Sequence, residues 1–406
     1  MQDNPELYTN LGEIIELLTD YHANGAYEKL KENVTLLDKE NYAVMIRTTN
    51  FESNDFINNL IYIDEHAYNF LKKSKVYPSD LVMNKIANPG AVYFMPEVHR
   101  PVSLGMNLFL IRIDAKKADP YFVYAYLRKN EQYVKSFASG STTKTITKDD
   151  VRRLVIYFPP IKEQKKIAQI LLTWDKAISV TEKLLTNSQY QKKSLMQQLL
   201  TGKKRLLDEN GERFSGEWKQ DVNLGSIINI SKGVQINKNT LSEDGQFPVI
   251  NGGIAPSGFT SEFNTDENTI TISEGGNSCG YVAFQKKSFW CGGHCYAVRK
   301  TALDLSFTFH LLKYNELKIM GLRVGSGLPN IQKKAIEAFT VNFPVTSVEQ
   351  QKIAAVLSAA DAEISTLEKK LVCLKNEKKA LMQQLLTGKR RVSVPVKVEE
   401  QEAVSA

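Results

Sequence analysis

Mostly apolar residues recur at alternating spacings of four and three positions in two long segments of the chain. Neither segment contains proline, and each ends at a glycine followed by basic residues, as helix C-termini often do. The repeated positions are Ile167, Leu171, Trp174, Ile178, Thr181, Leu185, Ser188, Lys192, Leu195 and Leu199 in the first segment, and Ile353, Leu357, Ala360, Ile364, Leu367, Leu371, Leu374, Lys378, Leu381 and Leu385 in the second. A 3.5-residue repeat sustained over four heptads predicts a coiled coil with these residues along its seam.

The two segments are copies of one another. Residues 163–205 and 349–391 align without gaps at an offset of 186, with 24 of 43 positions identical, and both contain MQQLLTGK. A period this long excludes a solenoid of short repeats. The chain therefore reads as a duplicated unit that consists of a globular domain followed by a long helix.

Two near-identical seams in one chain most simply pack on each other, although two helices packed separately on their own domains remain an alternative. About 145 residues separate the helices, so either direction of pairing is open to the chain. We expect an antiparallel pair because it relates the two copies by a pseudo-two-fold axis. Ala360 is small enough to lie opposite Trp174 in one register.

The regions before the helices show strand-like alternation, short helical segments at 120–130 and 306–317, and a closing Gly/Ser loop before an FP dipeptide. The expected fold is α+β, with two mixed α/β domains joined by a long antiparallel two-helix coiled coil. The predicted divisions are domain 1 (1–160), helix 1 (161–203), a linker (204–220), domain 2 (221–345), helix 2 (346–389) and a disordered tail (390–406).

The two domains share an outline but little sequence. Both begin with a similar motif, LGEII at 11–15 and LGSII at 224–228, and their closing segments keep the same spacing from Ile146 and Ile331 to the FP dipeptide. Helices that must match each other are constrained, whereas the domains are free to differ. This arrangement is typical of a protein that recognises two different targets at a set separation.

Charge is concentrated on the helices. The chain carries a net charge of +7, and residues 162–205 and 348–391 carry +7 and +4, so the remainder carries about −4. A polyanionic partner is compatible with this balance. If the domains bind DNA, they need a few localised basic loops rather than a uniformly basic surface.

Composition narrows the class of protein. Apolar residues make up 42% of the chain, which is typical of a globular protein, and no stretch reads as a membrane span or a secretory signal. Four cysteines do not form a disulfide framework. We therefore expect a cytoplasmic protein with reduced thiols.

Catalytic and cofactor motifs are not evident. The Gly-rich loops at 251–258, 273–280 and 291–295 fit no nucleotide-binding pattern, and turns between strands are the simpler interpretation. Cys279, Cys291, His294 and Cys295 lack the spacing of common structural zinc sites. We expect no metal, no cofactor and no catalytic residues in this chain, with a zinc hydrolase built on domain 2 as a remaining alternative.

Short basic and polar loops are the features that suit nucleic acid. Arg and Lys pair with guanine, Asn and Gln pair with adenine, and backbone NH groups of Gly/Ser loops suit phosphates. Each loop alone also fits an ordinary solvated turn, but similar loops recur at matching places in both domains. The candidate DNA-binding residues are Arg47, Thr49, Asn50, Lys85, Arg100, Ser141, Thr143, Lys144, Lys232, Lys238, Asn251, Asn277, Lys286, Arg323, Ser326 and Asn330.

This layout resembles the specificity subunit of type I restriction–modification systems over the whole chain except the tail. The most specific elements are FPPIKEQKKIA (158–168), FPVTSVEQQKIA (343–354) and the repeated LMQQLLTGK (195–203 and 381–389). They are similar to the two conserved regions of that family, each of which follows a target-recognition domain. The loops ending at Lys144 and Asn330 match a DNA-facing segment of the family.

The resemblance implies a non-catalytic subunit that reads double-stranded DNA. Each recognition domain would read half of a bipartite site in the major groove, and the coiled coil would fix the spacer. Two adenine methyltransferase (M) subunits and restriction/translocase (R) subunits would be partners, and they would hold S-adenosylmethionine, ATP and Mg. A stand-alone two-headed DNA-binding protein is the alternative within the same class.

Overall fold

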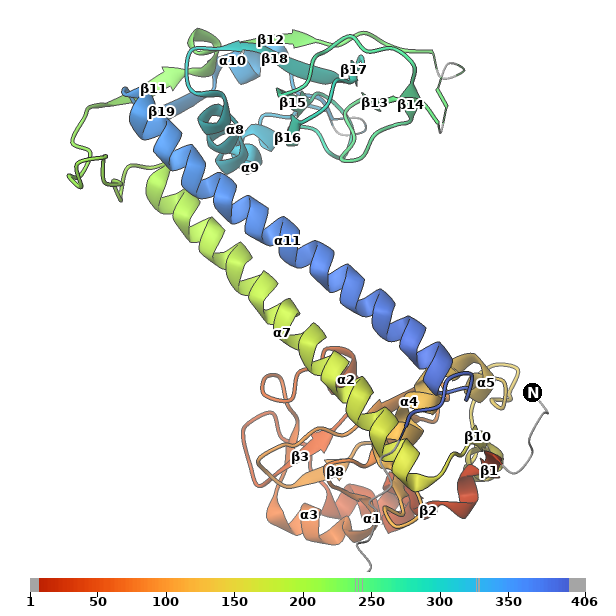
Figure 1. Cartoon of the computed structure of the whole chain (residues 1–406). Helices are drawn as coiled ribbons and strands as arrows, with labels where there is room; N and C mark the ends of the chain where they lie inside the picture. Colours follow the sequence, from red (N-terminus) through yellow and green to blue (C-terminus); the bar gives the residue numbers. More distant parts are fainter. Residues whose placement is uncertain are drawn as a thin grey trace, which may run out of the picture. The chain divides into compact units, whose positions relative to one another are not determined.

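The computed structural model describes residues 7–393 apart from 238, 240, 243, 326 and 328. The chain divides into two compact units, unit 1 (Met1–Val180 and Val372–Ala406) and unit 2 (Thr181–Leu371). The divisions fall inside two long helices, α7 (Ile161–Leu199) and α11 (Ser347–Leu385), so each unit combines one globular domain with part of both helices (Figure 1). Most of the predicted tail, and the candidates Lys238 and Ser326, lie outside the described residues.

Two four-stranded sheets and one two-stranded sheet build domain 1. The central sheet is antiparallel, with the order β2 (Ile15–Asp20), β9 (Leu108–Ile113), β6 (Leu81–Asn84) and β7 (Val92–Phe94). The second sheet has the order β4 (Tyr62–Ile63), β3 (Ala43–Ile46), β8 (Val102–Leu104) and β5 (Lys75–Val76), and β3 is parallel to β8. The remaining strands are β1 (Tyr8–Asn10) and β10 (Val155–Tyr157).

Short helices complete domain 1: α1 (Tyr27–Asn33), α2 (Thr48–Glu52), α3 (Glu65–Phe70), α4 (Pro120–Lys129), α5 (Glu131–Lys135) and α6 (Lys148–Arg153). Proline at the first position of α4 and the Asp119 carboxylate, which accepts a hydrogen bond from Phe122 N, begin that helix. The inner face of α4 joins the central sheet in the main hydrophobic core. Ile167 and Leu171 of α7 and Leu385 of α11 enter the same core, so the long helices are integral to unit 1.

Domain 2 has the same four-stranded central sheet and two-stranded sheet, but its second sheet contains three strands among the described residues. Its central sheet has the order β12 (Ile228–Lys232), β18 (Cys295–Thr301), β15 (Thr269–Ser273) and β16 (Val282–Gln285). A second sheet contains β14 (Phe259–Thr260), β13 (Phe247–Ile250) and β17 (Trp290–Cys291), and the third contains β11 (Trp218–Asn223) and β19 (Thr340–Pro344). The helices are α8 (Leu305–Tyr314), α9 (Glu316–Met320) and α10 (Lys333–Ala338).

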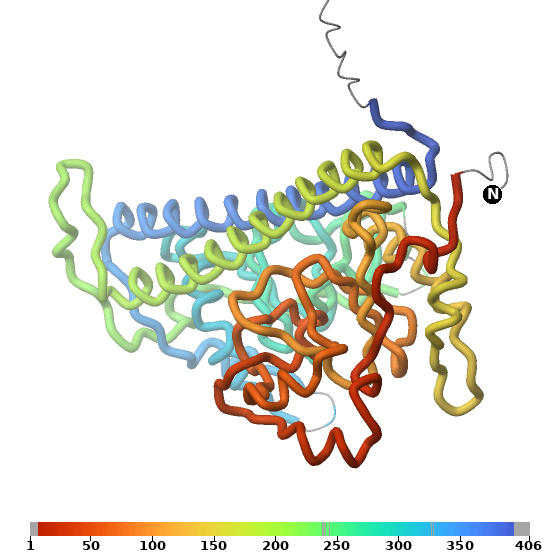
Figure 2. Tube along the Cα trace, turned by 90° about the horizontal axis from the view of Figure 1, so that it is seen from below, coloured from red at the N-terminus to blue at the C-terminus, as the bar shows by residue number. Residues whose placement is uncertain are grey.

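The core of unit 2 also includes both long helices. Phe307 and Leu311 of α8 pack with Ile353 and Leu357 of α11 and with Leu199 of α7. Between α7 and β11 the connector forms an open loop, drawn in light green in Figure 2, with a bridge between Leu207 and Arg213. The strand β11 begins at Trp218, three residues before the predicted start of domain 2.

The long helices run antiparallel within each unit, as predicted. In unit 1 Asp175 of α7 pairs with Lys378 of α11, and in unit 2 Asp361 of α11 pairs with Lys192 of α7. The two pairs are related by the repeat offset of 186. All predicted seam residues are buried or half-buried, which confirms the coiled coil. Trp174 lies next to Asp175 and therefore level with the turn around Lys378, not with Ala360.

The repeated EQ dipeptide fastens each domain to its helix. Gln164 accepts a hydrogen bond from Asp119 N at 3.0 Å and donates one to the Pro159 carbonyl at 2.7 Å. Gln350 does the same with Asp304 N and Pro344 O, at 2.9 Å each. Both glutamine side chains are buried. Each therefore provides a hydrogen-bond partner for the backbone NH of the residue that precedes a domain helix and for a proline carbonyl at or just after a strand.

The two long helices end at glycines whose conformation only glycine adopts easily. Gly202 and Gly388 have φ of +71° and +72°. A Cβ at Gly388 would stand 2.8 Å from the Tyr157 hydroxyl, whereas one at Gly202 would stand 3.3 Å from the Trp218 ring.

Replacement of Gly202 or Gly388 by alanine carries a backbone cost of about 1–2 kcal/mol. We expect Gly388→Ala to lower the melting temperature further, because Tyr157 must also move; equal shifts in the two variants would contradict this.

Unit 2 contains a buried histidine, His310, whose Nε2 lies 2.9 Å from Ser358 Oγ. Burial lowers its pKa to about 4; the Lys192 charge also lowers it, whereas the Asp361 carboxylate opposes the shift. In the unfolded chain the His310 ring is protonated below about pH 6.5, whereas in the folded chain it stays neutral until about pH 4. The free energy of unfolding of unit 2 is therefore unaffected by this group above about pH 6.5 and declines as the pH falls towards 4. The total loss is up to about 3 kcal/mol.

Unfolding of unit 2 followed by hydrogen exchange between pH 7 and 4 measures this dependence. His310→Gln keeps a polar side chain without the titration, and we expect its stability to change less over the same range. A variant with the same pH dependence as the unmodified chain would contradict the assignment to His310.

Candidate nucleic-acid interface

In domain 1, charged residues gather where two strands of the central sheet end. Asp20 is the last residue of β2, and Lys85 follows β6 directly. Lys85 Nζ lies 2.7 Å from Asp20 Oδ2, and Lys148 Nζ lies 3.3 Å from Asp20 Oδ1. Burial alone would raise the pKa of Asp20, but Lys85 and then Lys148 outweigh it and hold that pKa below its usual value. Asp20 therefore stays ionised, and the cluster of Asp20, Lys85 and Lys148 carries one excess positive charge.

The closing loop of domain 1 is attached to the same place. Ser139 and Thr145 pair with each other, and Ile146 N donates to the Lys85 carbonyl at 3.1 Å. Gly140 has φ of +122°, and a Cβ there would approach Thr143 O to 2.4 Å, so this tight turn needs glycine. The loop presents three exposed candidates beside Lys85: Ser141, Thr143 and Lys144.

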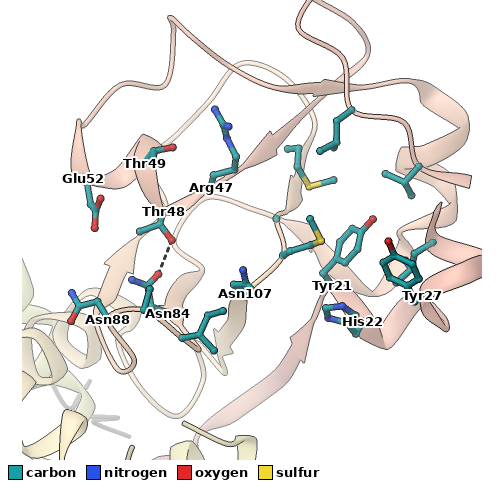
Figure 3. A pocket seen from close by; sticks show the side chains of 18 of the residues that line it. Tyr21, His22, Tyr27, Arg47, Thr48, Thr49, Glu52, Asn84, Asn88 and Asn107 are labelled. Atoms are coloured by element: carbon teal, nitrogen blue, oxygen red, sulfur yellow. Dashed lines mark hydrogen bonds between the residues drawn. The ribbon is translucent and has the colours of Figure 1, made fainter. Parts of the chain in front are cut away.

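A cavity of about 590 Å³ opens next to these strand ends (Figure 3). Tyr21, His22 and Tyr27 lie together on one side of it (Figure 3). The other side is polar and is lined by Arg47, Thr48, Thr49, Glu52, Asn84 and Asn88, with Asn107 between the two sides. Thr48 Oγ1 donates to Asn84 Oδ1 at 2.8 Å, which ties the start of α2 to the end of β6 (Figure 3).

The rim of this cavity holds two residues in the left-handed region. Ala87 and Asn107 both have φ of +66°. Lys85 N donates to the Asn107 carbonyl at 2.9 Å, so the two rim loops support each other. Such a conformation is unfavourable for alanine and is frequently found at functional sites.

In domain 2 an ion pair also lies where two strands of the central sheet end. Lys232 ends β12, Glu274 follows β15, and Lys232 Nζ lies 2.6 Å from Glu274 Oε1. The closing loop is again attached here, because Ile331 N donates to the Glu274 carbonyl at 2.8 Å. Asn330 pairs with both Val324 and Gly275, which places this candidate beside Glu274.

Other candidates of domain 2 lie around the same loop. Asn251 Oδ1 accepts a hydrogen bond from His294 N at 3.0 Å, and the His294 ring lies 3.6 Å from Glu274 Oε2. Asn277 is exposed in the turn after Glu274, and Arg323 is exposed just before Val324. The structure thus brings most candidates of each domain to one end of its central sheet.

Three candidates do not belong to these clusters. Asn50 is buried, its Oδ1 accepts from Arg47 N and its Nδ2 donates to Asp55 O, because residues 48–52 form α2 rather than a loop between strands. Arg100 pairs with Glu40 at 2.5 Å and lies over the Tyr62 ring. Lys286 is exposed just after β16, and no hydrogen bond or ion pair within the described ranges joins it to the other candidates.

Sequence reasoning missed several residues of these clusters: Asp20, Asn84, Asn107, Lys148 and Glu274. An acidic residue at the end of an alternating strand, as in IELLTD, is a weak signal for an ion pair. Its partner, 65 positions away, is defined only by strand order.

The cysteines of domain 2 are part of its interior. Cys279, Cys291 and Cys295 are buried, and Cys279 Sγ donates to the Glu274 carbonyl at 2.9 Å. Within the described ranges no three His, Cys, Asp or Glu side chains group in a way that could hold a metal ion. None of the described helices has the length and apolar character of a membrane span.

A solved structure shares this fold, and two sequence relatives are named as specificity subunits. A relative from Methanocaldococcus jannaschii named as a type I restriction enzyme specificity subunit is 27% identical over 95% of this chain and 96% of its own length. One from Mycoplasma pneumoniae, named as a type I specificity subunit, is 37% identical over 147 residues, but the match spans only 39% of that relative. The crystal structure of a type I restriction–modification S subunit from M. genitalium covers 95% of this chain and 98% of its own, with a TM-score of 0.68 and 19% identity, which shows the common fold.

The family model described as the type I restriction modification DNA specificity domain matches residues 8–187 and again residues 216–375. Each match contains one globular domain and a large part of the long helix that follows it. The duplication found in the sequence is therefore a duplication of this domain. The chain belongs to the family of type I restriction modification DNA specificity domains and carries that domain twice.

Proposed function

We propose that this chain is the DNA-reading specificity subunit of a type I restriction–modification complex and recognises a bipartite site, one half with each domain. The observation that carries the proposal is the recurrence of the same strand-end cluster and attached closing loop in both domains, with different side chains. Exposed Lys, Arg, Asn and Thr side chains at such a cluster provide the donors and acceptors that base edges require in the major groove.

The paired helices would act as a spacer between the two half-sites. Each helix has 39 residues. At about 1.5 Å per residue it extends roughly 60 Å, which is more than packing on a small domain requires. The cross-helix ion pairs and the repeated EQ contacts support this role, because they define the register of the helices and the attachment of each domain to them.

Partner subunits would supply the chemistry. We propose that two adenine methyltransferase subunits dock on this chain and that restriction/translocase subunits join them. S-adenosylmethionine, ATP and Mg would be held by those partners, and this chain would contribute recognition without catalysis.

Co-expression with the cognate methyltransferase subunit tests the proposal. We expect the two proteins to copurify and sequencing of methylated DNA to show one bipartite motif with adenine methylated in each half. Failure to copurify, together with no directed methylation, would reject the proposal. Tight sequence-specific DNA binding by the isolated chain in that case would indicate a stand-alone DNA-binding protein.

Insertion of one heptad into each helix tests the spacer. The insertions follow Leu184 in α7 and Lys370 in α11, which are equivalent positions of the repeat. Seven residues lengthen a helix by about 10 Å, or roughly three base pairs. We expect the recognised spacer to lengthen while both half-sites stay the same, and an unchanged spacer would contradict the role of the helices.

A further inference from the structure

The registers of the two central sheets identify equivalent positions in the two domains. In domain 1, Asp20 of β2 and Met83 of β6 both lie opposite Phe109 of β9. In domain 2, Lys232 of β12 and Ile272 of β15 both lie opposite Tyr296 of β18. Phe109 therefore corresponds to Tyr296, and Asp20 corresponds to Lys232.

Lys85 and Glu274 also correspond. Each follows the central strand by the same step, two residues after Met83 and Ile272, and each carbonyl accepts the hydrogen bond from the closing loop. The aromatic residue on the neighbouring strand contacts both: Lys85 Nζ lies 5.1 Å from the Phe109 ring centre, and Tyr296 Oη lies 3.2 Å from Glu274 Oε1.

The ion pair at this place is therefore reversed between the domains. The acid is on the first strand and the base on the central strand in domain 1, whereas domain 2 has the opposite order, with similar distances of 2.7 and 2.6 Å. An ion pair with either order of charges would hold the two strand ends together, so a purely structural role does not require the reversal. The reversal changes which charge stands under the closing loop, where the candidate DNA-binding residues lie.

Both central residues keep free hydrogen-bonding capacity on a partly exposed side chain. The Lys85 ammonium has three donors; within the part of the chain that the structure describes it makes one side-chain hydrogen bond, to Asp20, on a side chain that is 23% exposed. Among the described residues, Glu274 Oε1 accepts from Lys232 and Tyr296, whereas Oε2 has the His294 ring at 3.6 Å as its polar neighbour, on a side chain that is 13% exposed. Domain 1 thus offers donors here, and domain 2 offers an acceptor.

We propose that Lys85 and Glu274 are specificity-determining residues that make the two domains select different bases at the same position of their half-sites. Lys85 donates to O6 and N7 of a guanine, and Glu274 accepts from the exocyclic amino group of a cytosine. This inference rests on the proposed function and goes beyond it by naming one position in each domain and the base chemistry that it selects.

Methylation sequencing with single substitutions tests the inference in the complete complex with the cognate methyltransferase. Glutamine pairs with adenine rather than guanine, so we expect Lys85→Gln to lose guanine at one position of one half-site, with discrimination falling roughly ten- to a hundredfold and adenine gaining. Glu274→Gln, which is isosteric, is expected to lose cytosine in the other half-site. In each variant the unaffected half-site reports that the complex is assembled and active.

Controls come from the opposite ends of the same sheets. Lys116 follows the far end of β9, and Glu267 precedes β15; both are exposed. Lys116→Gln and Glu267→Gln remove the same charges, and we expect both half-sites to stay unchanged. Lys85→Arg keeps guanine-pairing donors and is expected to retain the original half-site.

The outcomes distinguish a failure of the proposed function from a failure of the base assignment. No bipartite methylation with the unmodified chain would reject the proposed function and this inference with it. Directed methylation by the unmodified chain, with both half-sites unchanged in Lys85→Gln and Glu274→Gln, would overturn the inference alone. A uniform fall in methylation of all sequences would also overturn it, since that result indicates phosphate contacts, as would loss of all methylation in both Lys85→Gln and Lys85→Arg.

Discussion

Replacement of Arg205 by methionine is expected to destabilise unit 2 by roughly 3–5 kcal/mol, the cost of leaving a buried charge without its partner. The Arg205 guanidinium donates to both oxygens of Glu349, at 2.5 and 2.7 Å, and to the Gly216 carbonyl at 2.9 Å. The Glu349 side chain is 1% exposed. Without Arg205 its carboxylate is left in the interior, uncompensated.

The repeat provides a matched control for this substitution. Arg391 makes the same bidentate contact with Glu163 in unit 1, but the arginine there is 51% exposed and the glutamate 6%. We expect Arg391→Met to cost less, because water reaches the ion pair and screens it. Hydrogen exchange of peptides from the two units in urea measures each effect locally. Equal losses would show that burial does not govern the cost.

Leu171→Asp is expected to destabilise unit 1 by on the order of 4–5 kcal/mol, because it both removes packed apolar volume and buries a charge. Leu171 is fully buried in the core that α7 shares with α4 and the end of α11. The carboxylate would face apolar side chains there. We expect loss of the compact fold of unit 1, visible as rapid hydrogen exchange across α4 and the first half of α7.

The neighbouring residue is the control for helix propensity and added charge. Leu172 is 46% exposed, so Leu172→Asp places the same charge one position along the helix in contact with water. We expect a cost of about 1 kcal/mol or less, as for an ordinary surface substitution. Similar exchange rates in the two variants would show that the seam is not packed as described.

The sequence by itself predicted the helices and their pairing, because coiled-coil seams depend on a local period that each segment carries within itself. Every seam position from Ile167 to Leu199, and from Ile353 to Leu385, is buried or half-buried in the structure. Polar members such as Thr181 and Lys192 also follow the period. The duplication was equally readable, since it depends only on comparing one part of the chain with another.

Tertiary structure decided the register of the helices and the composition of the strand-end clusters. The antiparallel register depends on pairs such as Asp175 with Lys378, which are 203 positions apart. The same holds for the burial of Asn50, which follows from the packing of a five-residue helix that has no period of its own. Local patterns do not specify such contacts, because strand order and packing bring together residues that no short segment contains.

The reversed ion pair shows this division most clearly. Asp20, Lys85, Lys232 and Glu274 are four ordinary charged residues in the sequence, and two of them were candidates there only for their position in loops. Strand register alone makes them equivalent in pairs and places each pair under a closing loop. The sequence therefore determined that the chain has two differing domains on a duplicated helix, whereas the tertiary structure decided which side chains distinguish the domains, because charge placement in a sheet depends on non-local strand pairing.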